Sequence, residues 1–300
     1  MLEVKVNGEV SGYFIMTATK PDGTTRLLAE FPNIITDLGL NQMATANNYL
    51  NYCQVGSGSA TPAASDIALS SRIASTLTKI SQTDGVQTSS PYFVWSRRTY
   101  RFAAGVATGN ISEVGVSAVS VGQLFSRALV LDTMGAPTAI TVLADEILDV
   151  AYEFRYYAKI TDDTGSVTLT GGLGATYSWI FRPANIGTSN TSTGWYQNQA
   201  MNTGSQFRVY AGTIGSITTI PSGVNAVVNT MSSNAYVTGS FTQSFVMTAG
   251  PADGNIVGGI RSIAMKMGMG YFQLQLTPAI PKTAADTLAL SISHTWARRP

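Results

Sequence analysis

The fold class is decided by the stretch Leu288-Ala289-Leu290-Ser291-Ile292-Ser293-His294-Thr295-Trp296. Its large side chains, from Leu288 to Trp296, occupy every second position, and small or hydroxyl residues fill the positions between them. Alternation with a period of two is typical of a half-buried β-strand. Similar runs rich in Thr, Val, Ile and Tyr recur between turns along the 300 residues. The sequence therefore predicts an all-β protein of antiparallel sheets, arranged as sandwich or jelly-roll-like domains.

Two local signals add detail to this fold. Lys20-Pro21-Asp22-Gly23 separates two strand-like runs, and a Pro-Asp-Gly turn in that position predicts a β-hairpin. Thr36 can cap a helix, because Asp37 follows in the first turn and helix-forming residues continue after it. Gly39 weakens that helix, so we expect one short helix near residues 37–46.

A domain boundary is expected near Thr161-Asp162-Asp163-Thr164-Gly165, where polar turn residues interrupt the strand pattern. We expect an N-terminal β domain over residues 1–160 and a C-terminal β-sandwich domain over residues 161–300. The pair Asp162-Asp163 belongs to this turn and does not form a calcium loop, because the ligand spacing of such a loop is absent.

Charged residues make up only 12% of the chain, although a typical soluble domain carries about 25%. Apolar residues make up 44%, so the chain is not disordered. The centres of large assembly interfaces are depleted of charge, and we therefore interpret the deficit as a surface that meets other subunits. The alternative is a neutral, hydroxyl-rich β-protein that is simply soluble.

The same composition excludes several classes of function. A formal net charge of +1 gives no global field that would attract nucleic acid or an anionic membrane. We see no apolar run long enough to span a bilayer, so we expect no membrane insertion. The first residues lack the long apolar core of a secretory signal. Cys53 is the single cysteine, which rules out an intrachain disulfide and a cysteine-based zinc site.

Only one histidine is available for catalysis. His294 lies on the apolar face of its strand beside Trp296, and this placement favours a packed, hydrogen-bonded side chain. A catalytic triad would need a distant nucleophile to reach His294, and no motif marks one. The chain also lacks a nucleophile-elbow pattern and a P-loop. We therefore predict no catalytic, cofactor-binding or metal-binding residues and no enzymatic activity.

Paired carboxylates are the remaining candidates for chemistry. Asp145, Asp149 and Glu153 share one face of a strand pattern, together with Arg155. Two such carboxylates could act as the acid and base of a glycosidase. We favour a solvated or subunit-facing strip instead, because no cleft with substrate-stacking aromatic residues is evident. In that strip the carboxylates pair with arginines such as Arg97, Arg98 and Arg101.

Three other groups of residues bear on binding. The run Ser96–Arg101 is basic and aromatic and could contact a phosphate, but in a neutral protein it favours an ion-pairing or interface strand. Trp195-Tyr196 lies in a polar loop, where exposed aromatic side chains would suit a surface carbohydrate. Met265, Met267 and Met269 share a strand face and predict core packing, or else an adaptable contact between subunits.

Several segments together resemble one family. Phe31–Asn41, followed by Cys53–Gly58 and Ala64–Leu69, is similar to a pattern of tail-associated and fibre-like proteins of tailed bacteriophages. In that pattern an N-x-I-T-x-x-G-L element precedes a V-G-x-G turn and a loop that contains Pro and Asp. Further segments fit the same family: Asn110–Val116, Leu124–Val130 and Thr138–Arg155. The resemblance extends over residues 33–157, and the second half of the chain adds no signature.

The resemblance implies a virion component that assembles symmetrically, as a trimer or a ring, and it implies no chemistry. We expect a structural protein of the tail, collar or baseplate, made in the host cytoplasm, that connects or stabilises neighbouring tail components or fibres. Its partners would be copies of itself and other phage virion proteins. Two alternatives stay open: a tail-fibre module that binds glycans of the host surface, and a capsid decoration protein.

Two features of the residues agree with assembly. Val55-Gly56-Ser57-Gly58 predicts a tight turn with positive backbone angles. The long strand that ends at Tyr157 offers a wide surface for pairing, and pairing between strand edges is a route to assembly.

Overall fold

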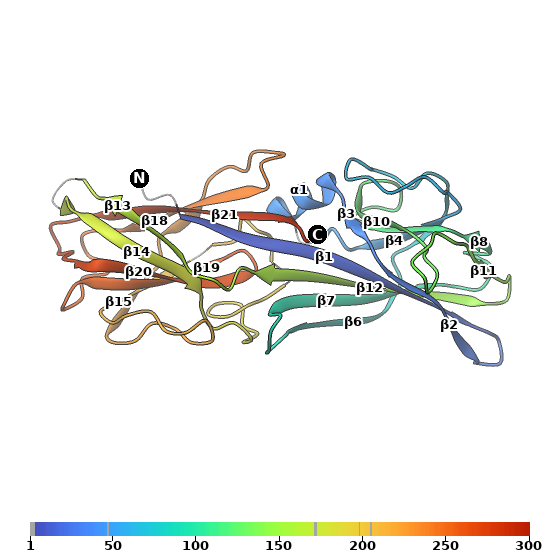
Figure 1. Cartoon of the computed structure of the whole chain (residues 1–300), viewed down its shortest axis with the longest axis horizontal. Helices are drawn as coiled ribbons and strands as arrows, with labels where there is room; N and C mark the ends of the chain where they lie inside the picture. Colours follow the sequence, from blue (N-terminus) through green and yellow to red (C-terminus); the bar gives the residue numbers. More distant parts are fainter. Residues whose placement is uncertain (1–3, 47, 171–172, 198, 205) are drawn as a thin grey trace. The chain divides into compact units, whose positions relative to one another are not determined.

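The structure is a computed structural model that describes residues 4–46, 48–170, 173–197, 199–204 and 206–300. Within these ranges the chain is all-β with one short helix (Figure 1). Every strand pair whose register is described is antiparallel. The predicted fold class is therefore confirmed.

The chain forms two compact units. Unit 1 contains residues 4–9, 85–94 and 157–296. Unit 2 contains residues 10–84, 95–156 and 297–300. The chain passes from one unit to the other within five strands: β1 (Val4–Thr19), β6 (Lys79–Val86), β7 (Phe93–Phe102), β12 (Ile147–Ala158) and β21 (Leu288–Arg298). The division expected at residue 160 lies close to the passage within β12, but residues 4–9 and 85–94 belong to the unit that holds most of the second half.

Unit 2 is built from three groups of strands. The first is a five-stranded sheet with the order β3 (Ile34–Ile35), β10 (Leu124–Leu129), β9 (Glu113–Ser117), β4 (Tyr52–Gly56) and β5 (Arg72–Thr76). The second is the pair β11 (Ile140–Val142) and β8 (Gly109–Ile111). In the third group β12 lies between β1 and β7, β6 follows β7 at one edge, and β2 (Thr25–Pro32) pairs with β1.

The core of unit 2 is aromatic. Phe125 of β10 lies 5.6 Å from Phe154 of β12 and 4.5 Å from Tyr49, measured between ring centroids. Tyr152, Phe154 and Tyr156 occupy alternate positions of β12, and all three are buried. Alternate residues of a strand point to the same side of its sheet, so this face of β12 covers the core.

The predicted helix is confirmed as α1 (Asp37–Thr45). The Thr36 side chain caps it, because Oγ1 accepts a hydrogen bond from the Gly39 N–H at 2.8 Å. Packing explains why glycine occupies position 39, since a Cβ there would lie 2.2 Å from the backbone oxygen of Phe125 in β10. Close approach to β10 therefore outweighs the low helix propensity of glycine here.

The predicted hairpin is confirmed as β1 and β2. Lys20 N donates to Thr24 O at 2.9 Å, and Gly23 N donates to Lys20 O at 2.9 Å. Gly23 has a φ of 85°, the left-handed conformation that favours glycine in such a turn. The register of the pair shifts between Met16 and Thr17, which marks a bulge. Among the described residues β2 pairs with β1 alone, so its outer edge is open.

Unit 1 contains a six-stranded sheet with the order β13 (Asp163–Thr168), β14 (Thr176–Pro183), β20 (Gly270–Ile280), β19 (Ile260–Met267), β15 (Phe207–Tyr210) and β16 (Asn225–Val228). A second group joins β17 (Met231–Ser233), β18 (Thr242–Ala249) and β21. The strand predicted at residues 288–296 is confirmed as β21, and its large side chains are buried at alternate positions. The two groups meet where His294 of β21 contacts Phe272 of β20, at 5.4 Å between ring centroids.

Candidate functional site

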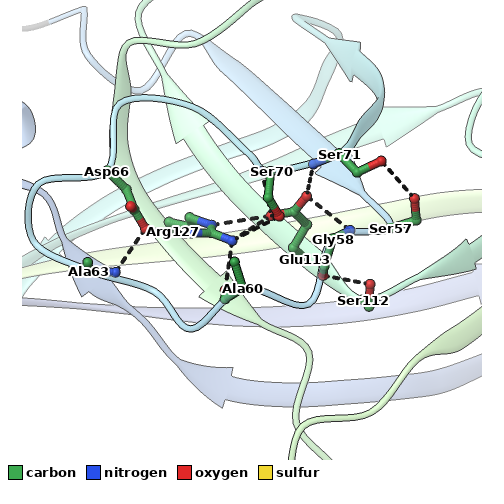
Figure 2. Close-up of polar contacts among 10 residues, drawn as sticks. All are labelled: Ser57, Gly58, Ala60, Ala63, Asp66, Ser70, Ser71, Ser112, Glu113 and Arg127. Atoms are coloured by element: carbon green, nitrogen blue, oxygen red, sulfur yellow. Dashed lines mark hydrogen bonds and ion pairs between the residues drawn. The ribbon is translucent and has the colours of Figure 1, made fainter.

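A buried carboxylate closes the loop of residues 57–71 in unit 2. Glu113 of β9 is fully buried, and its oxygens accept hydrogen bonds from the backbone N–H groups of Gly58, Ser70 and Ser71 at 3.1, 3.0 and 2.6 Å (Figure 2). The Ser70 hydroxyl donates a further hydrogen bond at 3.1 Å. Since Gly58 begins the loop and the two serines end it, Glu113 holds both ends of the loop together.

Arg127 of β10 approaches the same carboxylate from the other side (Figure 2). Its Nη2 and Nε lie 2.8 and 3.2 Å from Glu113 Oε2, and only 3% of the Arg127 side chain is exposed. Nη1 forms an ion pair with Asp66, and Nη2 donates to the carbonyl oxygen of Ala60 at 2.8 Å. Both partners lie in the middle of the loop, so Glu113 and Arg127 together fix it along its length.

The protonation state of Glu113 follows from these contacts. Burial opposes ionisation, but hydrogen bonds from Ser71, Ser70 and Arg127 outweigh it and hold the pKa of Glu113 below its ordinary value of 4.5. The carboxylate is therefore ionised at neutral pH. Because its oxygens are occupied by donors of the protein itself, the role of Glu113 is structural.

The glycines of Val55-Gly56-Ser57-Gly58 serve a purpose other than the one predicted. Neither Gly56 nor Gly58 has a positive φ, so the predicted turn conformation is wrong. Instead the backbone passes so close to its neighbours that a side chain has no room. A Cβ on Gly56 would lie 2.4 Å from the carbonyl oxygen of Ser71, and one on Gly58 would lie 2.4 Å from Glu113 Oε1.

A partly apolar groove in unit 2, here called the β2 groove, lies along the open strand edge. Its volume is about 680 Å³, and its walls are residues 27–32 of β2 and the facing segment 131–140. A smaller hollow of about 310 Å³ shares Pro32 and Leu131 with it and reaches Pro62 of the anchored loop. Exposed apolar surface beside an open strand edge is typical of a site where another chain adds a strand.

The wall opposite β2 has a fixed shape. Asp132 N donates to Ala136 O at 2.9 Å, and Asp132 Oδ1 accepts hydrogen bonds from the N–H groups of Met134 and Ala136, both at 2.9 Å. Gly135 adopts a φ of 80°, which completes the turn. Met134 at its tip is 91% exposed, so an apolar side chain projects from this wall into solvent.

Only two of the three carboxylates predicted to share a strand face lie in the same strand. Asp149 and Glu153 lie in β12, but Asp145 lies in the exposed turn before it, so the expected common face of all three is wrong. Asp149 and Glu153 are four positions apart on an extended strand, which is about 13 Å between their Cα atoms. A glycosidase pair needs carboxyl groups about 5–9.5 Å apart. The two side chains are held by different arginines, so the structure gives no support to a glycosidase that uses them as acid and base.

Both carboxylates are instead paired with arginine, as the favoured interpretation expected. Asp149 accepts hydrogen bonds from Arg101 at 2.7 and 2.8 Å. Glu153 accepts one from Arg97 at 2.8 Å and one from Arg155 at 2.6 Å.

The side chains of the basic and aromatic run Ser96–Arg101 point alternately to the two faces of β7. Arg97 and Arg101 point outward toward the carboxylates of β12, whereas Arg98 and Tyr100 are buried. The Tyr100 hydroxyl donates to Leu50 O at 2.6 Å inside the core. The contacts of Arg97 and Arg101 agree with the ion-pairing strand that the sequence favours for this run.

The side chain that motivated carbohydrate binding is buried. Trp195 is only 1% exposed, its Nε1 donates to Ala184 O at 2.9 Å, and its ring packs at 5.3 Å from Phe272. The expectation of an exposed Trp195 is therefore wrong. Its neighbour Tyr196 is half-buried. In this polar loop the tryptophan fixes the loop to the core of unit 1.

Lys266 is a buried charge that the sequence patterns did not identify. It lies in β19 between Met265 and Met267, and its Nζ donates to the carbonyl oxygens of Gly194 and Met269 at 2.9 and 3.3 Å. Burial lowers the pKa of Lys266 to about 7. The three methionines are also buried, which confirms their predicted place in the core.

The single histidine and the single cysteine are both inside the protein. Burial, with a smaller contribution from the nearby Lys266, lowers the pKa of His294 to about 3. His294 is therefore a neutral imidazole packed on Phe272, as the sequence predicted for a core position. Burial also raises the pKa of the Cys53 thiol, which keeps it protonated and poorly reactive.

In the part of the chain that the structure describes, no group of three or more His, Cys, Asp or Glu side chains could hold a metal ion. No helix among the described residues has the length and apolar character needed to cross a bilayer. No protein-family model, curated protein or solved structure matches the chain. Its function is therefore inferred from its residues and their contacts.

Proposed function

We propose that this chain is a non-catalytic structural protein of a bacteriophage virion. In this proposal it belongs to the tail, collar or baseplate, assembles with copies of itself, and connects or stabilises neighbouring tail components or fibres. The observation that carries the proposal is the β2 groove, which is partly apolar and lies beside an open strand edge. Such a surface suits a polypeptide better than a small polar substrate.

The polar groups of unit 2 support a structural role. Glu113, Asp149 and Glu153 are all held by arginine, which leaves none of these three carboxylates poised for acid–base chemistry. The low content of charged residues, 12% of the chain, agrees with a surface covered by other subunits. The phage assignment itself depends on the resemblance of residues 33–157 to tail-associated proteins.

The alternatives from the sequence are affected differently. The proposal that the chain binds host glycans is weakened, because Trp195, the residue that suggested it, is buried. A capsid decoration protein shares the all-β, weakly charged character and differs only in its position in the particle. Position in the particle is therefore the property to measure.

The experiment is to purify particles of the phage that encodes this chain, detect the chain by mass spectrometry, and trace it in a cryo-electron microscopy reconstruction. We expect several symmetry-related copies in the tail, collar or baseplate. Copies on the capsid would replace the proposal with the decoration alternative. Absence of the chain from purified particles would refute both.

A further inference from the structure

Unit 2 has a second exposed edge besides β2, formed by residues 72–80 and here called the basic edge. It comprises β5, the last strand of the five-stranded sheet, and the start of β6, the last strand beside β7. Ile73, Leu77 and Ile80 on this edge are 38%, 59% and 46% exposed. Further along β6, five consecutive residues from position 80 to 84 are exposed, so both faces of the strand are uncovered there. An edge of this kind is a template for pairing with another chain.

The charges of the basic edge are both positive. Within residues 72–80 the charged residues are Arg72 and Lys79, and the next charged residue along β6 is the exposed Asp84, outside this segment. Among the described residues neither Arg72 nor Lys79 is in an ion pair, and the Lys79 ammonium lies 5.8 Å from the ring centre of Tyr100.

The β2 groove carries the opposite charge. Glu30 and Asp132 are the charged residues of its lining, and both are exposed. The nearby Arg26 does not compensate them, because it is held by Glu146 through hydrogen bonds of 2.8, 3.1 and 3.2 Å. The groove lining therefore presents two negative charges on partly apolar walls, and neither is in an ion pair among the described residues.

We propose that copies of this chain assemble head to tail, with the basic edge of one copy lying along the β2 groove of the next. The inference rests on the proposed self-assembly and names the surfaces that carry it. Each contact would bring the apolar side chains of the basic edge against the groove walls, and Arg72 and Lys79 near Glu30 and Asp132. Pairing of two like edges would instead bring equal charges together, which costs binding free energy. A head-to-tail contact uses two different surfaces of the molecule, and it produces a closed ring when the rotation between copies permits closure.

The test uses two charge reversals in the full chain, Glu30→Lys and Lys79→Glu, with the molar mass measured by light scattering. Each variant alone places like charges at every contact, so the dissociation constant of the assembly should rise about tenfold or more. The double variant Glu30→Lys/Lys79→Glu should assemble again, because its reversed groove meets a reversed edge at every contact, whatever the number of copies in the assembly. Matched controls with the same charge changes elsewhere, Glu9→Lys and Lys20→Glu, should assemble like the unmodified chain.

The outcomes separate this inference from the proposed function. If the unmodified chain assembles and both variants assemble equally well, the head-to-tail contact is wrong while self-assembly stands. If the single variants dissociate and the double variant does not recover, charge pairing between these two edges is also refuted. The milder variants Glu30→Gln and Lys79→Gln give intermediate loss if the inference holds, and they replace any reversal that fails to fold. A monomeric unmodified chain at micromolar concentration would overturn the self-assembly itself.

Discussion

Replacement of Glu113 by glutamine is the sharpest test of how unit 2 holds its loop. The substitution keeps the shape of the side chain but removes the charge and turns one acceptor oxygen into a donor group. In the structure the two oxygens accept six hydrogen bonds, two of them from Arg127. In the variant, several of those donors would face an N–H group and lose their partner.

The magnitude follows from the burial of both partners. Removing one member of a buried ion pair costs about 3–5 kcal/mol, because the other charge stays buried without compensation. Here Asp66 still contacts Arg127, and the glutamine oxygen can still accept, so we expect about 3 kcal/mol. For a unit of this size each kcal/mol lowers the unfolding midpoint by roughly 2–4 °C, which gives a shift of roughly 6–12 °C.

The assay is thermal and urea unfolding of the variant beside Glu153→Gln, followed by circular dichroism. The control also removes a carboxylate from unit 2, but its partners Arg97 and Arg155 are 47% and 36% exposed, so a loss of less than about 1 kcal/mol is expected. In addition, proteolysis within residues 57–71 should become faster in Glu113→Gln only. Equal stability of the two variants would refute the reasoning that Glu113 and Arg127 anchor the loop.

Acid should reveal the same anchor in the unmodified chain. Because the pKa of Glu113 is held below 4.5, its contribution to stability is present above that pH and is lost as the pH falls through the lower pKa of the folded state. The pKa of Lys266 is about 7 in the folded state against an ordinary 10.5, so the free energy of unfolding should rise with pH between these two values. The rise is at most about 5 kcal/mol. Urea unfolding at several pH values should show it in the unmodified chain and not in Lys266→Met. His294 should show no titration between pH 5 and 8 in NMR spectra, and a midpoint in that range would contradict its burial as a neutral ring. The Cys53 thiol should resist labelling by maleimide until the chain is unfolded, since it is buried in β4. Gly56→Ala should lower the unfolding midpoint, because its Cβ would lie 2.4 Å from a backbone oxygen, and unchanged stability would show that the loop can move away.

Local sequence patterns correctly predicted the structural features that depend on residues close together in the chain. The alternation from Leu288 to Trp296 appears as β21, and Lys20-Pro21-Asp22-Gly23 forms the turn of the first hairpin. Thr36 caps α1 as its position before Asp37 predicted. Each of these features is decided by residues within a few positions, which a single sequence contains directly.

Features that depend on tertiary contact were missed or misinterpreted. Trp195 sits in a polar loop, and its burial is decided by Phe272, a residue of a distant strand. The partnership of Glu113 and Arg127 arises because β9 and β10 pair in the sheet. One signal could have revealed it: each is a lone charge within a strand-like run of uncharged residues. A charge in such a run is buried only if it finds a partner, so two of opposite sign on neighbouring strands predict a buried pair.

The proposed function depends most on self-assembly, and the molar mass of the unmodified chain in solution tests self-assembly directly. Light scattering across micromolar concentrations should give a defined multiple of 31.7 kDa that persists on dilution within that range. A constant mass of 31.7 kDa, that of a single chain, would contradict the proposal that its weakly charged surfaces and open strand edges are covered by other copies.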